Sequence, residues 1–174
     1  MSLDDAIEMT VGGLTLDPAT KSPIVVLQDP GKTVNLPIWI GLLEATAIAT
    51  ELEGIQMARP MTHDLLRDLI GELGARVSRV EISDLRENTY YAQIHIQTSQ
   101  GARIIDSRPS DAISLALRVK TPIFVARKVL AATASSGPQA EQDATADPDL
   151  SSVAPEKWSE ILERMSPDDF KYKM

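Results

Sequence analysis

Two short segments of this 174-residue chain each place an Arg-Pro pair just ahead of a hydroxyl residue and an aspartate. They are residues 59–64 and 106–112, and each runs directly into an apolar stretch with helical spacing. Proline keeps the preceding arginine extended and sets the direction of the chain as it enters a helix. A hydroxyl or carboxylate group at that point caps free backbone amides. The segments therefore predict two helix starts at which charged side chains gather.

Apolar residues that alternate with polar ones predict strands, and apolar residues at helical spacing predict helices. We expect the first strand to end at Gly12-Gly13 and a turn near Glu87-Asn88 to join the two strands of an antiparallel hairpin. Thr62 is the expected cap of the second helix and Gly74 its end, while the helix after Pro109 is apolar nearly all round and should be deeply buried. The expected strands are residues 7–11, 24–27, 34–40, 79–83, 90–97, 103–105 and 122–125, and the expected helices are 41–53, 62–73 and 109–119. This order predicts an α+β fold with a mostly antiparallel or mixed sheet and helices packed on it.

The composition divides the chain into a domain at residues 1–130, a flexible linker at 131–154 and a C-terminal docking helix with a tail at 155–174. The linker is rich in Ala, Ser, Thr, Pro, Gln and Asp, which cannot form a core. Beyond it, Trp158, Ile161, Leu162 and Met165 recur at i, i+3, i+4 and i+7. A helix this short is marginal alone in water, so we expect it to dock on its own core, on a second copy or on another protein.

Several classes of protein are excluded by what the sequence lacks. It has no cysteine, which rules out disulfides, thiolate metal sites and a cysteine nucleophile. It has no phosphate-binding loop, no glycine-rich dinucleotide motif, no Gly-x-Ser-x-Gly and no His-Glu-x-x-His. No apolar run approaches the ~20 residues of a membrane span, and the first residues lack the pattern of a signal peptide. We therefore expect a cytoplasmic protein of bacterial type with no membrane association.

The net charge of −8 argues against a protein that coats nucleic acid, because affinity for a duplex comes largely from Lys and Arg. The acidity is uneven. Residues 1–130 hold 13 Lys and Arg against 16 Asp and Glu, while residues 131–174 hold 4 against 9. A metal-dependent nuclease can also be acidic at its site, because its cations bridge carboxylate and phosphate. The charge thus weakens a nuclease interpretation without excluding it.

Four motifs in order carry a resemblance to a known family. They are Leu36-Pro37-Ile38-Trp39-Ile40-Gly41, then Glu44-Ala45, then Arg59-Pro60 with Thr62-His63-Asp64, and then residues 105–113. Over about residues 3–130 the chain resembles the bifunctional nuclease domain family of small bacterial and plant proteins. The resemblance implies a homodimer and, as is ascribed to some members, nuclease activity on both DNA and RNA. It supplies no catalytic constellation that can be transferred residue by residue.

Metal-dependent hydrolysis of a phosphodiester needs hard oxygen ligands, a water nucleophile and cationic groups for the developing charge. The candidate ligands for Mg²⁺ or Mn²⁺ are Asp106 and Asp111, with Asp64 and Glu44 behind them. Asp106 ends a strand and Asp111 lies in the first turn of the next helix, so the two should share one rim. The remaining candidates are Arg59 and Arg108, as bidentate holders of phosphate, and His63, as a general base or metal ligand.

Each candidate also has a structural interpretation. Asp111 can simply cap its helix, and Asp106, Arg108, Arg59 and Asp64 can pair with one another to join two helix starts. Glu44 can lie on a solvated helical stripe, and His63 can be a surface residue. The rival to the nuclease is thus a non-enzymatic homodimeric binding or regulatory module with a structural Asp/Arg cluster. Carboxylates open to solvent would favour the enzyme, and carboxylates fully bonded to arginine would favour the rival.

Overall fold

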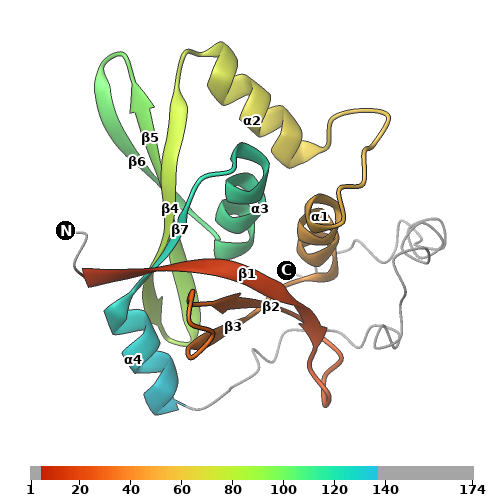
Figure 1. Cartoon of the computed structure of the whole chain (residues 1–174), viewed down its shortest axis with the longest axis vertical. Coiled ribbons are helices and arrows are strands. Elements are labelled where there is room, and N and C mark those ends of the chain that lie inside the picture. Colours follow the sequence, from red (N-terminus) through yellow and green to blue (C-terminus); the bar gives the residue numbers. More distant parts are fainter. Residues whose placement is uncertain (1–4, 137–174) are drawn as a thin grey trace.

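The computed structural model describes residues 5–136 and contains seven strands and four helices within that range (Figure 1). The strands are β1 (Ala6–Leu16), β2 (Pro23–Gln28), β3 (Asn35–Trp39), β4 (Arg76–Arg86), β5 (Thr89–Thr98), β6 (Gly101–Ser107) and β7 (Ile123–Ala126). The helices are α1 (Leu42–Leu52), α2 (Thr62–Glu72), α3 (Pro109–Val119) and α4 (Arg127–Ser136). The predicted hairpin is present, and its turn residues Glu87 and Asn88 both have positive φ.

The strands form one mixed sheet in the order β3-β2-β1-β7-β4-β5-β6. All neighbouring pairs are antiparallel except β4 and β7, which run parallel. A parallel neighbour requires a crossover, and the helix that follows β6, α3, lies on this connection to β7. The expected α+β fold with a mixed sheet is confirmed.

The strand β1 is longer than the sequence predicts, because it continues through Gly12-Gly13 instead of ending there. Its first part pairs with β7 and its second part with β2, and the register shifts between Val11 and Gly13. A β-bulge of this kind bends a strand, and Gly13 adopts a φ of +149° that favours glycine. The glycine pair is thus a bend within the strand that joins the two halves of the sheet.

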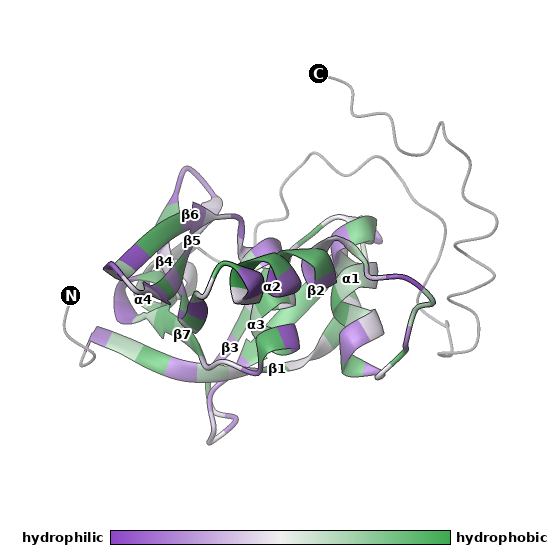
Figure 2. Cartoon of the chain, turned by 90° about the horizontal axis from the view of Figure 1, so that it is seen from above, coloured by the Kyte–Doolittle hydropathy of each residue, from purple (hydrophilic) through white to green (hydrophobic). Residues whose placement is uncertain are grey.

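Helix α3 lies at the centre of the core, as its all-round apolar sequence predicts. Ala112, Ile113, Leu115 and Ala116 are at most 1% exposed. Helices α1 and α2 both pack against α3 (Figures 1 and 2). The two predicted Arg-Pro helix starts therefore lie on helices that pack against each other, α2 and α3.

The start of α2 differs from the prediction. Met61, not Thr62, is the N-cap residue, and its backbone amide donates to Asp64 Oδ2 at 2.9 Å. Asp64 reaches back because it lies three residues beyond the cap, where a carboxylate can bond the capping amide. No residue of α2 is buried, and its leucines remain largely exposed.

The chain beyond β7 also differs from the prediction. Helix α4 continues to Ser136, so the start of the segment that we expected to be a linker, from residue 131, is helical. The rest of that segment and the expected helix at 155–174 lie outside the described residues. Among the described residues, no helix is long and apolar enough to cross a membrane.

A buried arginine joins the three core helices. The Arg118 side chain, on α3, is 1% exposed, and its Nε donates to Asp64 Oδ1 of α2 at 2.8 Å. Its Nη2 donates to the Ala47 carbonyl of α1 at 3.1 Å, and its Nη1 to the Ser114 carbonyl of its own helix at 3.0 Å. A buried cation is tolerated only when it is paired and its donors are bonded.

Replacing Arg118 with alanine should destabilise the protein by about 3 kcal/mol or more, because Asp64 Oδ1 and the buried carbonyl of Ala47 lose the donor that Arg118 supplies. Chemical denaturation followed by circular dichroism measures the loss. Arg86→Ala is the matched control, since Arg86 pairs with Asp84 at the surface and should cost much less. Equal losses in the two variants would contradict the structural role of Arg118.

Candidate functional site

The start of α3 carries an arginine that holds two carboxylates. Arg108 is the N-cap residue, and Pro109 follows it at the first helical position. Its Nε donates to Asp111 Oδ2 at 2.7 Å and its Nη2 to Asp111 Oδ1 at 3.2 Å. Its Nη1 donates to Glu44 Oε1 of α1 at 2.9 Å. This bidentate geometry is the one that a guanidinium and a carboxylate prefer.

The histidine at the start of α2 completes the group. His63 Nε2 lies 3.1 Å from Asp111 Oδ1, so the same carboxylate oxygen contacts both His63 and Arg108. We call Glu44, His63, Arg108 and Asp111 the Arg108 cluster. It brings together the starts of α1, α2 and α3, and four of the seven predicted site residues belong to it.

The cluster opens to solvent mainly through its arginine. The Arg108 side chain is 59% exposed, whereas those of Glu44, His63 and Asp111 are 16%, 12% and 31% exposed. Burial alone would raise the pKa of Asp111, but its bonds with Arg108 and His63 outweigh this and hold that pKa below its usual range. The bond with Asp111 likewise raises the pKa of Arg108. Arg108 and Asp111 are thus a charged pair at neutral pH, and the guanidinium of Arg108 faces outward.

Asp64 lies beside the cluster but turns away from it. Its two oxygens accept bonds from Arg118 and from the Met61 amide. Burial would raise the pKa of Asp64, but these bonds outweigh it and keep that pKa low. Arg59 is exposed on the segment between α1 and α2, where no ion pair joins it to another residue of the range 5–136. Neither residue contacts the Arg108 cluster.

The expectation that Asp106 and Asp111 share a rim is not supported by the geometry. Asp106 lies on β6 opposite Gln93, and successive strand residues point to opposite faces. Ala92 and Ile94, next to Gln93, are in the core, so Asp106 faces away from the core and from α3. Within residues 5–136, no three His, Asp or Glu side chains come close enough together to hold a metal ion.

A second polar group, separate from the Arg108 cluster, lies on the face of the sheet that carries Asp106. The sequence patterns did not predict this group. Glu81, whose side chain is 4% exposed, lies 3.3 Å from Arg79 Nη2 and 3.6 Å from His95 Nε2. Burial lowers the pKa of His95, and the Arg79 guanidinium lies 5.6 Å from the centre of the Phe124 ring. The alternation of β4 and β5 indicates the shared face, but it does not reveal which of its residues are buried.

Arg118 was also missed as a residue that supports the site. An arginine near the end of a largely apolar helix was the signal that the sequence offered. That signal does not show which backbone carbonyls the guanidinium reaches, because these belong to helices far away in the chain. Its bonds with α1 and α2 hold in place the helix starts that carry Glu44 and His63.

The match to known proteins covers the same segment as the site. Residues 25–137 match the family model described as the bifunctional nuclease domain. The chain belongs to the bifunctional nuclease domain family. The matched segment contains the whole Arg108 cluster, Asp64, Arg118 and the second polar group around Glu81. It leaves out β1.

The relatives fall into two groups. An uncharacterized protein of Mycobacterium tuberculosis is 40% identical over 94% of this chain and 98% of its own length. Bifunctional nuclease 2 of Arabidopsis thaliana is 28% identical over 66% of this chain, and Bifunctional nuclease 1 of Oryza sativa subsp. japonica is 28% identical over 65%. These matches span 36% and 35% of the two plant proteins, so only about a third of each is shared.

The lowered pKa of Asp111 gives a prediction about pH. A carboxyl whose pKa is lower in the folded chain stabilises it above the unfolded value, ~3.9, and this stabilisation is lost as the pH falls through the folded value. Asp111→Asn should therefore cost about 1 kcal/mol at pH 7, and the difference from the native chain should shrink below about pH 4. Urea denaturation at a series of pH values measures it, with Asp106→Asn as the control. A difference that grows in acid would contradict the assigned direction.

Proposed function

We propose that this protein is a nuclease that hydrolyses phosphodiester bonds and that the Arg108 cluster is its active site. The observation that carries the proposal is the pairing of His63 with Asp111 beside an exposed guanidinium. In this proposal His63 accepts a proton, the carboxylate of Asp111 positions His63, and Arg108 binds an anionic oxygen. The family and the printed names of its plant members support the same reaction class.

His63 would activate the water. If its Nε2 donates to Asp111, as the contact of 3.1 Å suggests, Nδ1 carries a lone pair and can accept a proton. In the proposed step a water molecule attacks phosphorus and gives its proton to Nδ1, and the bond to the leaving sugar oxygen breaks. His63 then returns the proton to that oxygen. Asp111 stabilises the imidazolium formed between the two transfers.

Arg108 would hold the phosphate. It uses donors on Nε, Nη1 and Nη2 for Asp111 and Glu44, and its high exposure leaves its outer edge open to an anionic oxygen. A guanidinium at this position neutralises charge that develops on the phosphoryl oxygens. Water is the nucleophile and no 2′-hydroxyl takes part, so the proposed reaction extends to both RNA and DNA.

The chemistry of phosphodiester hydrolysis and the candidate carboxylates led us to expect Mg²⁺ or Mn²⁺, and we keep that dependence as a separate proposal. Glu44 and Asp111 supply carboxylate oxygens, which suit a hard divalent cation. Both are bonded to Arg108 in the structure, so a metal would have to take over part of these bonds. A bound cation would supply further neutralisation of phosphate charge.

Two pairs of variants test the active site. His63→Asn should lower the rate of hydrolysis of single-stranded RNA and DNA by about 10²-fold or more, the share of a general base. Arg108→Lys keeps the charge but loses the planar fork, and we expect a loss of about 10²-fold. His95→Asn and Arg86→Lys are the matched controls, because they change the other histidine and another Asp-bonded arginine. Full activity in the His63 or Arg108 variant would contradict the assignment.

Metal dependence has its own test. Mg²⁺ or Mn²⁺ should raise the Tm of the native chain by mass action on the folded state, and Asp111→Asn should abolish the rise. Chelation by EDTA should lower hydrolysis. If neither ion changes the melting curve and activity survives chelation, the metal proposal is wrong while the roles of His63 and Arg108 stand.

One observation favours the second function, a non-enzymatic binding or regulatory module. Both carboxylates of the cluster are bonded to Arg108, which is the arrangement of a structural ion-pair network. We propose a homodimer under either function, on the family resemblance alone. An inactive chain, with and without metal, whose Arg108→Lys variant loses stability would support the module.

A further inference from the structure

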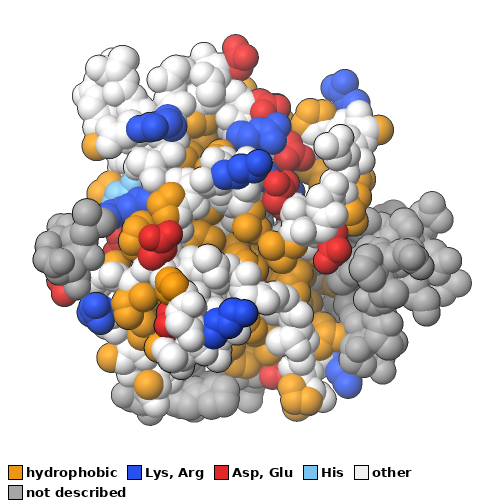
Figure 3. All heavy atoms as spheres, in the orientation of Figure 1, with side chains coloured by type: hydrophobic (Ala, Val, Ile, Leu, Met, Phe, Trp, Pro, Cys, Tyr) orange, Lys and Arg blue, Asp and Glu red, His pale blue; other side chains and the backbone are white. Residues whose placement is uncertain are grey.

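Helix α2 exposes an apolar surface that the described part of the chain does not cover. Its leucines at positions 65, 66 and 69 are 53%, 37% and 50% exposed, and the C-cap residue Leu73 is 82% exposed. In Figure 3, hydrophobic side chains lie at the surface over α2 among basic and acidic ones. A cluster of exposed leucines on one helix is characteristic of a contact surface, because single exposed apolar residues are common but gathered ones are not.

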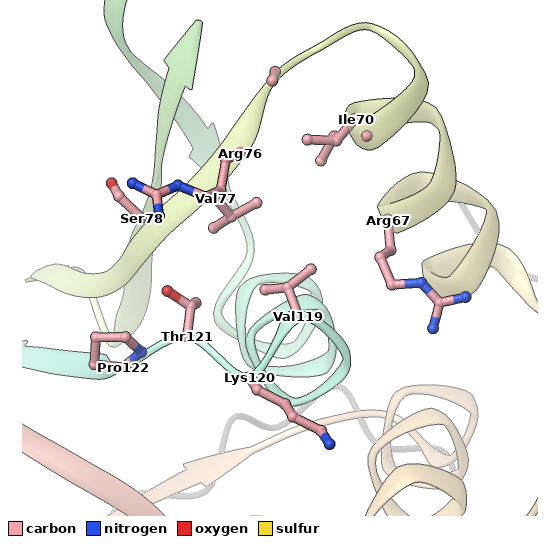
Figure 4. A pocket seen from close by; sticks show the side chains of 11 residues that line it. Arg67, Ile70, Arg76, Val77, Ser78, Val119, Lys120, Thr121 and Pro122 are labelled. Carbon is pink, nitrogen blue, oxygen red and sulfur yellow. The ribbon is translucent and has the colours of Figure 1, made fainter.

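A pocket of about 530 Å³ lies beside this helix, between α2, the end of α3 and the start of β4. Ile70, Val77 and Val119 point toward its centre from the three elements (Figure 4). The side chains of Arg67, Arg76 and Lys120 lie around it, and none of the described residues that line it is acidic. The pocket therefore suits an apolar side chain carried by an acidic segment.

Two of the three cations are available for such a segment. Arg67 is bonded to its neighbour Asp68. Arg76 and Lys120, by contrast, form no ion pair with any residue between 5 and 136. A basic surface without compensating carboxylates attracts an acidic chain and orients its approach.

We propose that residues 156–169 of the same chain dock on α2 and in this pocket. Their apolar residues, Trp158, Ile161, Leu162 and Met165, match an apolar surface, and Asp168 and Asp169 follow Met165 after two intervening residues. The segment from residue 131 onward is acidic, with 9 Asp and Glu against 4 Lys and Arg. Apolar and charged features of the segment thus both complement those of the pocket.

The length of the intervening chain permits docking within one molecule. Helix α4 ends at Ser136, on a different part of the domain from α2 (Figure 1). The stretch from Ser136 to Trp158 can extend to roughly 70 Å, whereas a domain of this size is only about 35 Å across. A tethered segment also acts at a high effective concentration, which favours its own domain over a second copy.

Trp158 itself can report the docking in the full chain. The sequence has two tryptophans, so Trp39→Phe leaves Trp158 as the only indole emitter. We expect its emission to be blue-shifted and less quenched by iodide than in the urea-unfolded chain. Leu69→Glu, at an exposed site on α2, should shift the emission to the red and increase quenching. Ile104→Glu, at a site on β6 that is 60% exposed, is the matched control and should change neither.

A charge-reversal variant and a dilution series complete the experiment. Lys120→Glu should also expose Trp158, and it decides the matter if circular dichroism shows that Leu69→Glu fails to fold. A Trp158 as exposed as in urea, or one that neither variant affects, would overturn the proposal. Protection of Trp158 that disappears on dilution would overturn it as well, because the segment would then dock on a second copy.

Discussion

The Arg118 guanidinium, itself almost fully buried, donates to a carboxylate of α2, a carbonyl of α1 and a carbonyl of its own helix α3. In a low-dielectric interior each of these bonds is strong, and each is costly to leave unmade. The bonds of this one guanidinium therefore hold α1, α2 and α3 in their relative positions. Glu44, His63 and Arg108 lie on those three helices near their starts, so the geometry of the Arg108 cluster depends on a residue that takes no part in it.

Much of the fold follows from local patterns. The β4–β5 hairpin was predictable because alternation and a two-residue turn are both local, and α3 because a helix that is apolar nearly all round has to be buried. The errors occurred where a distant partner decides the outcome. Gly12-Gly13 predicts a strand end, but β1 continues through it, because β7 pairs with the residues up to Met9 and β2 with those from Thr10 onward. Thr62 has the right chemistry for a cap, yet Asp64 bonds the amide one residue earlier.

The site, like the fold, was predictable where local motifs decide and was not predictable where distant partners decide. Both Arg-Pro motifs place charged residues at helix starts, and this was enough to bring His63, Arg108 and Asp111 together, with Glu44 from a third start. Asp106 was misplaced because its position depends on strand parity, which puts it on the face of Gln93. The distinction between free and arginine-bonded carboxylates was beyond the sequence, since it rests on side-chain distances of about 3 Å.

The bend in β1 has a consequence for where this domain begins. The family match starts at residue 25, within β2, yet β1 is the strand that connects β2 with β7 at the middle of the sheet. A chain trimmed to the matched segment would keep every residue of the Arg108 cluster and still lose the continuity of its sheet. The freed edges of β2 and β7 would each present unpaired amides and carbonyls, which recruit strands from other molecules. The physical domain boundary therefore lies before Ala6, ahead of the residue at which the family match begins.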